Sequence, residues 1–526
     1  MPEADGSGHS LFLCAFSQAD SLILNEMRSE VVFFLNGLQQ NIASDQAQMM
    51  LTDYLRLVRG LSGTKVVCSE GDCGACTILY ARLPREPGAK VSFRAVNSCI
   101  LMVAQLDGCI LVTIEGLKHP AHCAEVQEKL VCHHAAQCGY CTPGIVMALA
   151  GALEAKAPSH KLLTEQEAKN ALTGNLCRCT GYSPIISGAC NIDLKQALLP
   201  TVSALYATQA TIRCLRKACS QPLWLKPSPK SETDFEVFAP LTTKVACAFL
   251  RKNPAARIIG AGTDMGVQRN KRKQRLSQMV SLHLLKGAEK IKVLRTKQIS
   301  IGTNATIHEL RRALKQPLPE FARYLDLFAS PQIKNIATVV GNLANASPIG
   351  DLAPPLLVLN TEVDIANEKG TRSVALTQFF RSYRKTAVRK GELVSGIRFE
   401  IPDSDQVFTL YKISQRKDLD ISTINAAFNF RIENSSRQQT ISEARIAFGG
   451  VAAVPLRLTE LEGWLRGKQI HRGLYEMALP LLRQELSPIS DLRSTAAYRS
   501  VVAEKLLRRF FQSLLSQNQE TSHAFA

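Results

Sequence analysis

Several features that would assign a sequence to a broad class at once are missing from this one. No apolar run in its 526 residues approaches the ~18 needed to cross a bilayer, so a membrane span is not expected. The N-terminal stretch MPEADGSGHS lacks the basic segment that opens a secretory signal peptide. No internal repeat of fixed period is present. These absences predict a globular protein of the cytoplasm, a reducing compartment in which structural disulfides are rare.

Cysteine is absent from the last part of the chain. All 16 cysteines lie at or before Cys247. Because disulfides are rare in a reducing compartment, clustered thiols favour metal binding. The sequence therefore predicts a thiol-rich part and a thiol-free part with different roles.

The positive charge does not by itself indicate nucleic-acid binding. The net charge is +18, but Lys and Arg are spread along the chain, with one modest cluster at Arg269–Arg275. We interpret that cluster as a solvated face, because nucleic-acid binders usually concentrate basic residues in one patch or stripe. No nucleic-acid partner is expected.

The first folded segment has the pattern of a small mixed sheet with one helix against it. The run Val31–Gly37 is a β-branched and aromatic strand that ends in Asn-Gly, a strong hairpin signal. Residues 48–61 have helical apolar spacing. Residues 76–81 and 109–114 are further strands. Residues 1–28 are expected to be an extension outside this fold.

The pattern then changes to helices, which are expected at Ala124–Ala136, Pro143–Ala155 and Thr164–Thr173. The proline-rich stretch Gln221–Lys230 is interpreted as part of an interdomain linker. Beyond it, short strands alternate with helices to about residue 402, and a last α+β segment is expected over 407–515, followed by a polar tail.

A first set of four thiols has the spacing C-x4-C-x2-C…C, typical of plant-type [2Fe–2S] proteins. Its members are Cys68, Cys73, Cys76 and Cys99. Gly71 and Gly74 suit such a loop, because backbone amides must approach the cluster sulfurs and glycine allows the turns. Structural zinc usually shows two paired C-x2-4-C knuckles, and this set has one.

A second set of four thiols has the pattern C-x2-C…C-x-C. Its members are Cys138, Cys141, Cys177 and Cys179. The first two open a predicted helix, where first-turn amides and the helix dipole favour anionic thiolates. This set alone is compatible with zinc as well as with iron and sulfur. Two neighbouring sets of four favour two redox centres between which electrons pass.

The remaining cysteines lack such spacing and are interpreted as small buried hydrophobes. They are Cys14, Cys109, Cys123, Cys132, Cys190, Cys214, Cys219 and Cys247.

Two stretches of the second part have the composition of phosphate-binding loops. Residues 258–265, IIGAGTDM, follow a short strand, and their small residues and Thr263 hydroxyl would let donors reach a pyrophosphate. This is not the G-x-G-x-x-G pattern, and an ordinary tight turn is the alternative. Residues 328–351 are rich in donors and small side chains, with a plain polar loop as the alternative.

In order and spacing, the two thiol motifs and the two later stretches resemble the xanthine dehydrogenase (molybdenum hydroxylase) family. Gln137 matches the glutamine that precedes a ligand cysteine there, thought to lie near the pterin of the molybdenum cofactor. The resemblance implies a multidomain α+β chain. Its segments would be a β-grasp 2Fe-2S ferredoxin-type domain (29–115), a helical-bundle 2Fe-2S domain (116–200), a linker (201–234), a PCMH-type α+β FAD-binding domain (235–402) and an α+β flavoprotein C-terminal domain (407–515).

The resemblance also implies a set of FAD contacts. A pyrophosphate cradle would comprise Ile258, Ile259, Gly260, Ala261, Gly262, Thr263, Asp264, Met265, Thr338, Val339, Val340, Gly341 and Asn342. Asp351 would meet the adenosine part, Phe328 would pack near the isoalloxazine, and Lys412 would contact the flavin. Val340 and Ala261 stand where glycine is frequent in the family. Both are small enough to be compatible with the fold, and their effect on the loop geometry stays open at this point.

The function implied by the resemblance is electron transfer, with no catalytic residue expected on this chain. A large molybdopterin-binding xanthine dehydrogenase subunit would oxidise hypoxanthine or xanthine. Electrons would pass through two [2Fe–2S] clusters to FAD and then to NAD⁺, in a heterotetramer or larger assembly with two of each chain. The alternatives are the iron–sulfur and flavin chain of an aldehyde or aromatic-substrate molybdenum hydroxylase, and a zinc-binding scaffold without flavin.

Overall fold

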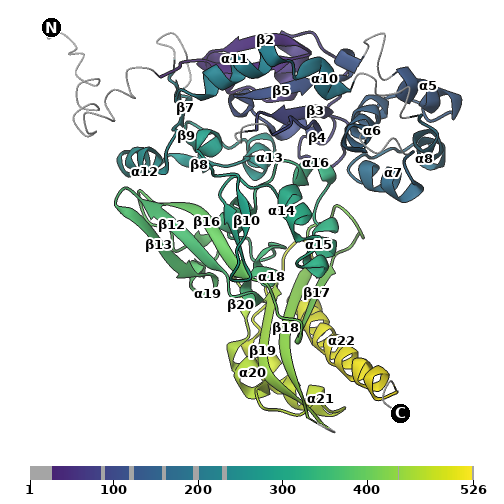
Figure 1. Cartoon of the computed structure of the whole chain (residues 1–526), viewed down its shortest axis with the longest axis vertical. Coiled ribbons are helices and arrows are strands. Elements are labelled where there is room, and N and C mark those ends of the chain that lie inside the picture. The colour runs from purple at the N-terminus through teal and green to yellow at the C-terminus, as the bar shows by residue number, and fades with distance from the viewer. Residues whose placement is uncertain are drawn as a thin grey trace. The chain divides into compact units, whose positions relative to one another are not determined.

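The computed structural model describes residues 27–84, 89–117, 124–156, 162–193, 201–227, 234–435 and 438–523 (Figure 1). The chain divides into two compact units, Met1–Lys286 and Gly287–Ala526, and each is considered by itself. Within the described ranges, no helix is long and apolar enough to span a bilayer.

The first unit begins with a five-stranded mixed sheet in the order β2-β1-β5-β3-β4. Its strands are β1 (Val31–Leu35), β2 (Leu38–Ile42), β3 (Thr77–Arg82), β4 (Arg94–Asn97) and β5 (Cys109–Val112). The predicted hairpin is confirmed, because Asn36 and Gly37 both have positive φ and join β1 to β2. The parallel pairing of β1 with β5 makes the sheet mixed, as predicted.

The helix predicted over 48–61 is shorter than expected. It comprises only α4 (Leu51–Asp53) and a following π-helical segment, Tyr54–Val58. Met50 forms a bridge with Met102, and the Leu51 amide donates to the Leu101 carbonyl, so the backbone before α4 is held in extended pairing.

Helices α5 to α8 form the helical part of the first unit. They are α5 (Ala124–Cys132), α6 (Thr142–Lys156), α7 (Glu165–Leu172) and α8 (Ser183–Cys190). Three match predicted helices, although α5 ends early because His134 has a left-handed φ of 52°. The sequence analysis missed α8. The apolar α6 packs against β3 and β4, which joins the helices to the sheet (Figure 1).

The segment predicted as a linker is mostly folded. Its described part contains α10 (Val202–Tyr206), α11 (Gln209–Cys219) and β6 (Leu223–Leu225). The strand β6 pairs with β7 (Glu236–Ala239), so the proline-rich stretch contributes a sheet edge, where proline is tolerated. The linker prediction is therefore wrong for residues 201–225, and 228–233 lie outside the described residues.

A second sheet of the first unit has the order β6-β7-β9-β8. The strands β7, β8 (Arg257–Ile259) and β9 (Gln278–Ser281) run parallel and are connected through α12 (Thr243–Lys252) and α13 (Thr263–Arg272). Parallel strands need such helical crossover connections, because a tight turn cannot join them.

A buried polar network ties these parts of the first unit together. Asp107, with a fully buried side chain, accepts hydrogen bonds from Arg28 Nη1 and Nη2 at 2.9 and 2.8 Å and from the Val32 amide at 3.0 Å. His283 Nε2 lies 3.1 Å from Asp107 Oδ2, and because a carboxylate only accepts, the ring donates there. Arg28 is therefore part of the fold, whereas 1–26 of the predicted extension lie outside the described residues.

The second unit starts with an antiparallel five-stranded sheet in the order β10-β11-β16-β12-β13. The strands are β10 (Ile291–Val293), β11 (Gln298–Gly302), β12 (Glu362–Asn367), β13 (Gly370–Ala375) and β16 (Leu393–Glu400). The helices between β11 and β12 are α14 (Ile307–Leu314), α15 (Pro319–Asp326), α16 (Pro331–Lys334), α17 (Val339–Ala344) and α18 (Ala353–Val358). Helix α14 begins at a capping box of Thr306 and Glu309.

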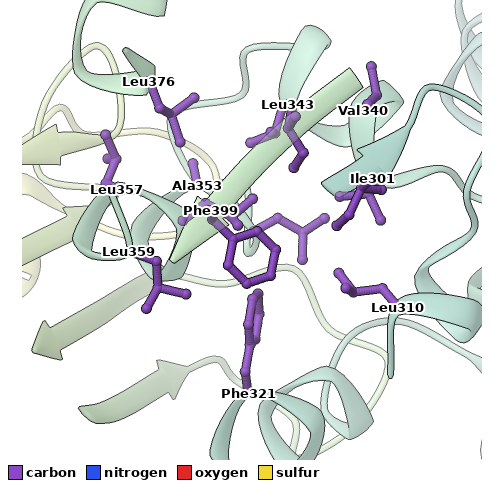
Figure 2. Packing of buried hydrophobic residues seen from close by; sticks show 14 of the residues in the cluster. Ile301, Leu310, Phe321, Val340, Leu343, Ala353, Leu357, Leu359, Leu376 and Phe399 are labelled. Atoms are coloured by element: carbon purple, nitrogen blue, oxygen red, sulfur yellow. The ribbon is translucent and has the colours of Figure 1, made fainter. Parts of the chain in front are cut away.

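The core of the second unit lies between this sheet and these helices. Figure 2 shows Phe321 of α15 and Phe399 of β16 facing each other, with ring centroids 6.4 Å apart. Val340 and Leu343 of α17 belong to the same apolar cluster. The short helix α17 is thus fixed by packing of its apolar side chains.

The last segment of the chain is a four-stranded antiparallel sheet covered by helices, as the α+β prediction required. Its elements are β17 (Gln406–Ile413), β18 (Ile424–Ser435), β19 (Gln438–Gly449), β20 (Leu456–Arg457), α20 (Thr459–Leu465), α21 (Leu474–Glu485) and α22 (Ala496–His523). Phe428 of β18 stacks on Phe510 of α22 at 4.4 Å, so α22 covers the sheet. Residues 516–523, predicted as a polar tail, continue α22.

Candidate functional site

The first thiol set lies in the loop before β3 and in the turn after β4. Cys76 and Cys99 are buried, whereas Cys68 and Cys73 are half-buried. Cys68 Sγ accepts the amides of Glu70 and Cys73 at 3.5 and 3.4 Å. Gly71 and Gly74, which the sequence analysis singled out, both have left-handed φ values, 79° and 70°. The loop is therefore wound so that amides and thiols converge.

The four thiols of the first set contact one another. Hydrogen bonds from Cys73 and Cys99 hold the pKa of Cys68 below its ordinary value, and as donors those two thiols have raised pKa values. A hydrogen bond from Cys99 likewise lowers the pKa of Cys76. The structure thus brings together all four residues that the spacing selected.

The second thiol set gathers between helices. Cys138 and Cys141 directly precede α6, and Cys177 and Cys179 lie in the loop between α7 and α8. The Cys138 and Cys179 sulfurs are 3.5 Å apart and both residues are exposed. The Tyr140 amide and then the Cys179 thiol lower the pKa of Cys138.

The other two thiols of this set also pair with each other. Burial and a hydrogen bond to Cys177 raise the pKa of Cys141 to about 12. Burial alone would raise the pKa of Cys177, but hydrogen bonds from Thr180 and the neighbouring backbone outweigh it, and the pKa is lowered. The predicted second set is thus assembled as two pairs.

The donor sets fit [2Fe–2S] clusters. In the described part of the chain, no three Cys, His, Asp or Glu side chains are arranged to hold a single metal ion. A [2Fe–2S] cluster requires a different arrangement, four thiolates with two on each iron. In the first set, Cys68 is hydrogen-bonded to both Cys73 and Cys99, and Cys76 to Cys99, while the second set forms two pairs, so each set offers four converging thiols.

The two thiol sets are in direct contact. The Leu176 amide donates to the Cys73 carbonyl at 2.9 Å, which links the residue before Cys177 to the first loop. Gly144 of α6 packs so closely on the first loop that a Cβ there would lie 2.3 Å from the Gly74 oxygen. Only glycine permits that approach.

The predicted phosphate loop 258–265 of the first unit is a strand–turn–helix. Ile259 ends β8 with a buried side chain, and Gly262 adopts a left-handed φ of 68° as the N-cap of α13. The N-cap residue of α13 is glycine, which supplies no side-chain oxygen to the first-turn amides, so these amides could meet an anion. Ala261 does not have a positive φ, so alanine in place of glycine leaves the turn unstrained.

The predicted stretch 338–342 of the second unit opens α17. Thr338 Oγ1 caps the Gly341 amide at 3.1 Å, and a Cβ on Gly341 would lie 2.6 Å from that oxygen. Asn342 Oδ1 is buried and has no partner in the described part of the unit. A buried amide oxygen without a partner fits a site completed by a ligand. Val340 belongs to the apolar core cluster, so the core accommodates the side chain that stands where the family frequently has glycine.

Phe328 lies in a turn held by a residue that the sequence analysis did not select. Lys334 is buried, and its ammonium donates to the carbonyls of Asp326 and Ala329, at 2.9 and 3.4 Å, on either side of Phe328. Burial lowers the pKa of Lys334 to about 8. Ala329 has a left-handed φ of 41°. The lysine thus stabilises an unusual turn that presents the predicted flavin aromatic.

Asp351 and Lys412, predicted as separate flavin contacts, form a buried ion pair. Lys412 Nζ lies 2.6 Å from Asp351 Oδ2, and Asp351 also accepts from Ser422 and, at 3.0 Å, from Asn425 Nδ2. The carboxylate joins the loop after α17 to β17 and β18. The structure therefore brings these two residues together, while their contacts with a flavin stay predictions.

The other cysteines differ in their environments. Cys109 and Cys247 are buried, as predicted, and Cys190, Cys214 and Cys219 are half-buried. Cys132 is exposed, so the prediction is wrong there, because it lies on the solvent face of α5. Cys14 and Cys123 lie outside the described residues.

The basic cluster is exposed from residue 271 to 275, which confirms a solvated face.

Three protein-family models match the chain. They are described as "[2Fe-2S] binding domain" (residues 113–190), "FAD binding domain in molybdopterin dehydrogenase" (233–403) and "CO dehydrogenase flavoprotein C-terminal domain" (409–514). Their order along the chain is the order predicted from the motifs, and the multidomain α+β architecture is confirmed.

Curated relatives cover nearly the whole chain. Xanthine dehydrogenase of Emericella nidulans is 28% identical over 95% of this chain and 40% of its own length. Xanthine dehydrogenase of Drosophila pseudoobscura pseudoobscura is 29% identical over 94% of this chain and 40% of its length. A solved structure of reconstituted CO dehydrogenase from Oligotropha carboxidovorans is 26% identical, with a TM-score of 0.49, over 53% of this chain and 96% of that chain.

The chain thus spans about two fifths of the length of the curated relatives it matches. The second thiol set lies within the region that matches the [2Fe–2S]-binding model, and the two predicted flavin stretches lie within the region that matches the FAD-binding model. The three matched domains, together with the xanthine dehydrogenase relatives, support the assignment of this chain as a [2Fe–2S] and FAD subunit of the molybdenum hydroxylase type.

Proposed function

We propose that this chain is the electron-transfer subunit of a cytoplasmic xanthine dehydrogenase. A large molybdopterin-binding partner oxidises hypoxanthine or xanthine, and this chain carries the electrons to NAD⁺. Its eight thiols of the two sets hold two [2Fe–2S] clusters, and residues 258–265, 338–342, Phe328, Asp351 and Lys412 bind FAD. When bound, the clusters and FAD supply the redox chemistry, and the protein sets their spacing and environment.

The observation that carries this proposal is a chain of contacts within the first unit. The second thiol set is bonded to the first through Leu176 and Cys73. The first set is bonded to α13, which begins at the phosphate loop, because Asn270 of α13 donates to the Cys99 carbonyl at 2.8 Å. The second thiol set therefore contacts the first, and the first contacts the helix that begins at the flavin loop. Electron transfer from one centre to the next requires such closeness.

The exposure of the second set supports an entry point for electrons. Cys138 and Cys179 are exposed, and so is Gln137. A redox centre that receives electrons from another protein must lie near the surface that the partner covers. The family resemblance of Gln137 to a residue near the pterin points to the same surface. We therefore place the partner over residues 137–141 and 177–181.

The proposed purine specificity rests on the xanthine dehydrogenase names of the relatives. Since the partner subunit would oxidise the purine, the test of this specificity needs the partner. The expected result is that affinity capture of the tagged chain retains a molybdenum-containing subunit, and that the complex reduces NAD⁺ with xanthine. Reduction of the acceptor by an aldehyde or an aromatic heterocycle, but not by xanthine, would overturn the purine assignment and leave the electron-transfer role. A colourless, zinc-loaded chain would overturn both.

Alanine at Phe328 is expected to weaken FAD binding by roughly 3- to 10-fold, because an aromatic contact contributes about 0.5–1.5 kcal/mol beyond area burial. Asparagine at Asp351 is expected to lower FAD content as well, since it removes the carboxylate while keeping the side-chain shape. FAD titration of the purified variants, followed by flavin fluorescence, measures both.

Phe408→Ala is the matched control, because Phe408 is also a partly buried aromatic packed on the same core. It should bind FAD as the wild type does. Wild-type affinity in both Phe328→Ala and Asp351→Asn would remove these two residues from the flavin site.

A further inference from the structure

Three asparagine side chains, from three parts of the first unit, contact the first thiol set. Asn97 of β4 donates to Cys76 Sγ at 3.8 Å. Asn175, next to the second set, donates to the Gly74 carbonyl at 3.0 Å. Asn270 of α13 donates to the carbonyls of Ser69 and Cys99 at 2.9 and 2.8 Å. The last two connect the first set to its neighbours on either side.

Asn175 lies at the junction of the two thiol sets. It is buried, two residues before Cys177, and the next amide, that of Leu176, donates to the Cys73 carbonyl. The backbones are so close here that a Cβ on Gly74 would lie 2.1 Å from the Gly174 oxygen. The Gly74 carbonyl also accepts the Thr77 amide and hydroxyl, at 3.0 and 2.6 Å, so the Asn175 amide is the donor that reaches it from the second thiol set. The side chain therefore holds the two backbones together.

Asn270 lies at the junction of the first set and the flavin-loop helix. Its amide reaches the loop that carries Cys68 through the Ser69 carbonyl, and the turn that carries Cys99 through that residue's own carbonyl. One turn earlier on α13, a Cβ on Gly266 would lie 2.1 Å from the Ile100 oxygen. The helix thus packs directly on the ligand-bearing backbone, and one side chain spans two separate ligand segments.

An uncharged donor suits both positions. The thiols become anionic when they hold a metal cluster, and a carboxylate beside them would add repulsion of like charges. A neutral amide can donate two N–H groups to carbonyls without adding charge. Asparagine is also short, so it fixes the distance between the two backbones more tightly than a long flexible side chain.

We infer that Asn175 and Asn270 are positioning residues that hold the first cluster site against the second cluster site and against the flavin loop, respectively. This inference rests on the proposed electron-transfer function and deepens it. Asn175 affects electron transfer between the two cluster sites, and Asn270 affects electron transfer from the first cluster site to the flavin.

The test uses the purified full chain with its iron–sulfur and flavin groups. In Asn175→Ala, low-temperature EPR of the reduced protein should show weaker magnetic splitting between the two cluster signals. In Asn270→Ala, that splitting should persist, whereas flavin reduction after rapid mixing with a reductant should slow. The midpoint potential of one cluster should shift in each variant.

Asn175→Asp and Asn270→Asp keep the side-chain size and should give the same two patterns, so they replace an alanine variant that fails to fold. Asn191→Ala is the matched control, because the exposed Asn191 side chain donates to the carbonyl of Ser187, a residue that belongs to neither thiol set, at 2.9 Å. It should leave every readout unchanged.

Two outcomes are distinguishable. Wild-type splitting, potentials and flavin reduction in folded aspartate variants of a protein with two clusters and flavin would overturn this inference alone. A wild-type chain with neither cluster signal nor flavin would overturn the proposed function and the inference with it.

Discussion

Serine at Cys73 is expected to remove one of two distinguishable [2Fe–2S] EPR signals and roughly half of the bound iron. The ligand is a thiolate, and a serine hydroxyl does not ionise near neutral pH, so the first site would lose one of four anionic donors. Cys73 is in contact with Cys68 of the same set, so the substitution would affect the first site and not the second. EPR and iron analysis of the purified variant measure both effects.

Cys132→Ser is the control for this substitution, since Cys132 belongs to neither set and is exposed on α5. It should retain both signals and all of the iron. Two unchanged signals in Cys73→Ser would contradict the assignment of Cys73 as a ligand. Loss of both signals together would contradict two independent sites.

Alanine at Asp107 is expected to destabilise the first unit by about 3–5 kcal/mol, the cost of removing one partner of a buried ion pair. The substitution leaves the Arg28 guanidinium without its counter-charge and removes the acceptor of the Val32 amide and His283 ring. Trp224 lies in β6 of this unit and Trp464 in the other, so urea unfolding in a Trp464→Phe background reports on the first unit through Trp224 fluorescence.

The stabilisation by Asp107 has a defined pH dependence. Burial would raise the pKa of Asp107, but hydrogen bonds from His283 and Arg28 outweigh it and hold the pKa below its ordinary value. A carboxyl group whose folded pKa is depressed stabilises the fold above its unfolded pKa of about 4 and loses that effect as the pH falls further. The wild-type advantage over Asp107→Ala should therefore shrink below about pH 4.

Asp234→Ala is the matched control, because Asp234 forms an exposed ion pair with Arg275 at 3.2 Å in the same unit. Its effect should stay within about 0.5 kcal/mol, as is usual for surface substitutions. An equally small effect at Asp107 would show that the buried network does not stabilise the unit.

The grouping of the thiols into two sets could be predicted from sequence, because most members of each set are separated by only a few residues. Cys68, Cys73 and Cys76 lie on one loop, and only Cys99 had to be brought from elsewhere. The hairpin at Asn36 and Gly37 was equally local, since positive φ at both positions depends on those two residues alone. Features that depend on a few neighbouring residues can be predicted from sequence, because distant contacts do not change them.

Other elements could not be predicted because tertiary partners decide them. The proline-rich stretch reads as a linker, yet β6 exists because β7 offers it a free edge. The helix at 48–61 is interrupted because Met50 pairs with Met102 instead of continuing a helix. Val340 looked like a misfit in a glycine-rich loop, but the core behind α17 accepts its side chain. In each case the deciding contact is distant in sequence.

The roles of Lys334 and of the three asparagines near the first thiol set could not be predicted from their residue types alone. An Asn or Lys in a polar stretch is usually solvated, and only the folded chain shows which carbonyls they reach. Asn97 stands two residues before Cys99 and Asn175 two before Cys177, so proximity to a ligand cysteine is the one cue that would have raised them as candidates. Asn270 has no such cue.

The tether between Asn270 and Ser69 spans 201 residues of sequence, which has a consequence for synthesis. At about 5–20 residues per second, a ribosome needs roughly 10–40 s to extend the chain from one residue to the other. During that interval the first cysteine loop has been made but lacks the helix that later packs on it. The nascent loop is then open on the side that α13 will cover.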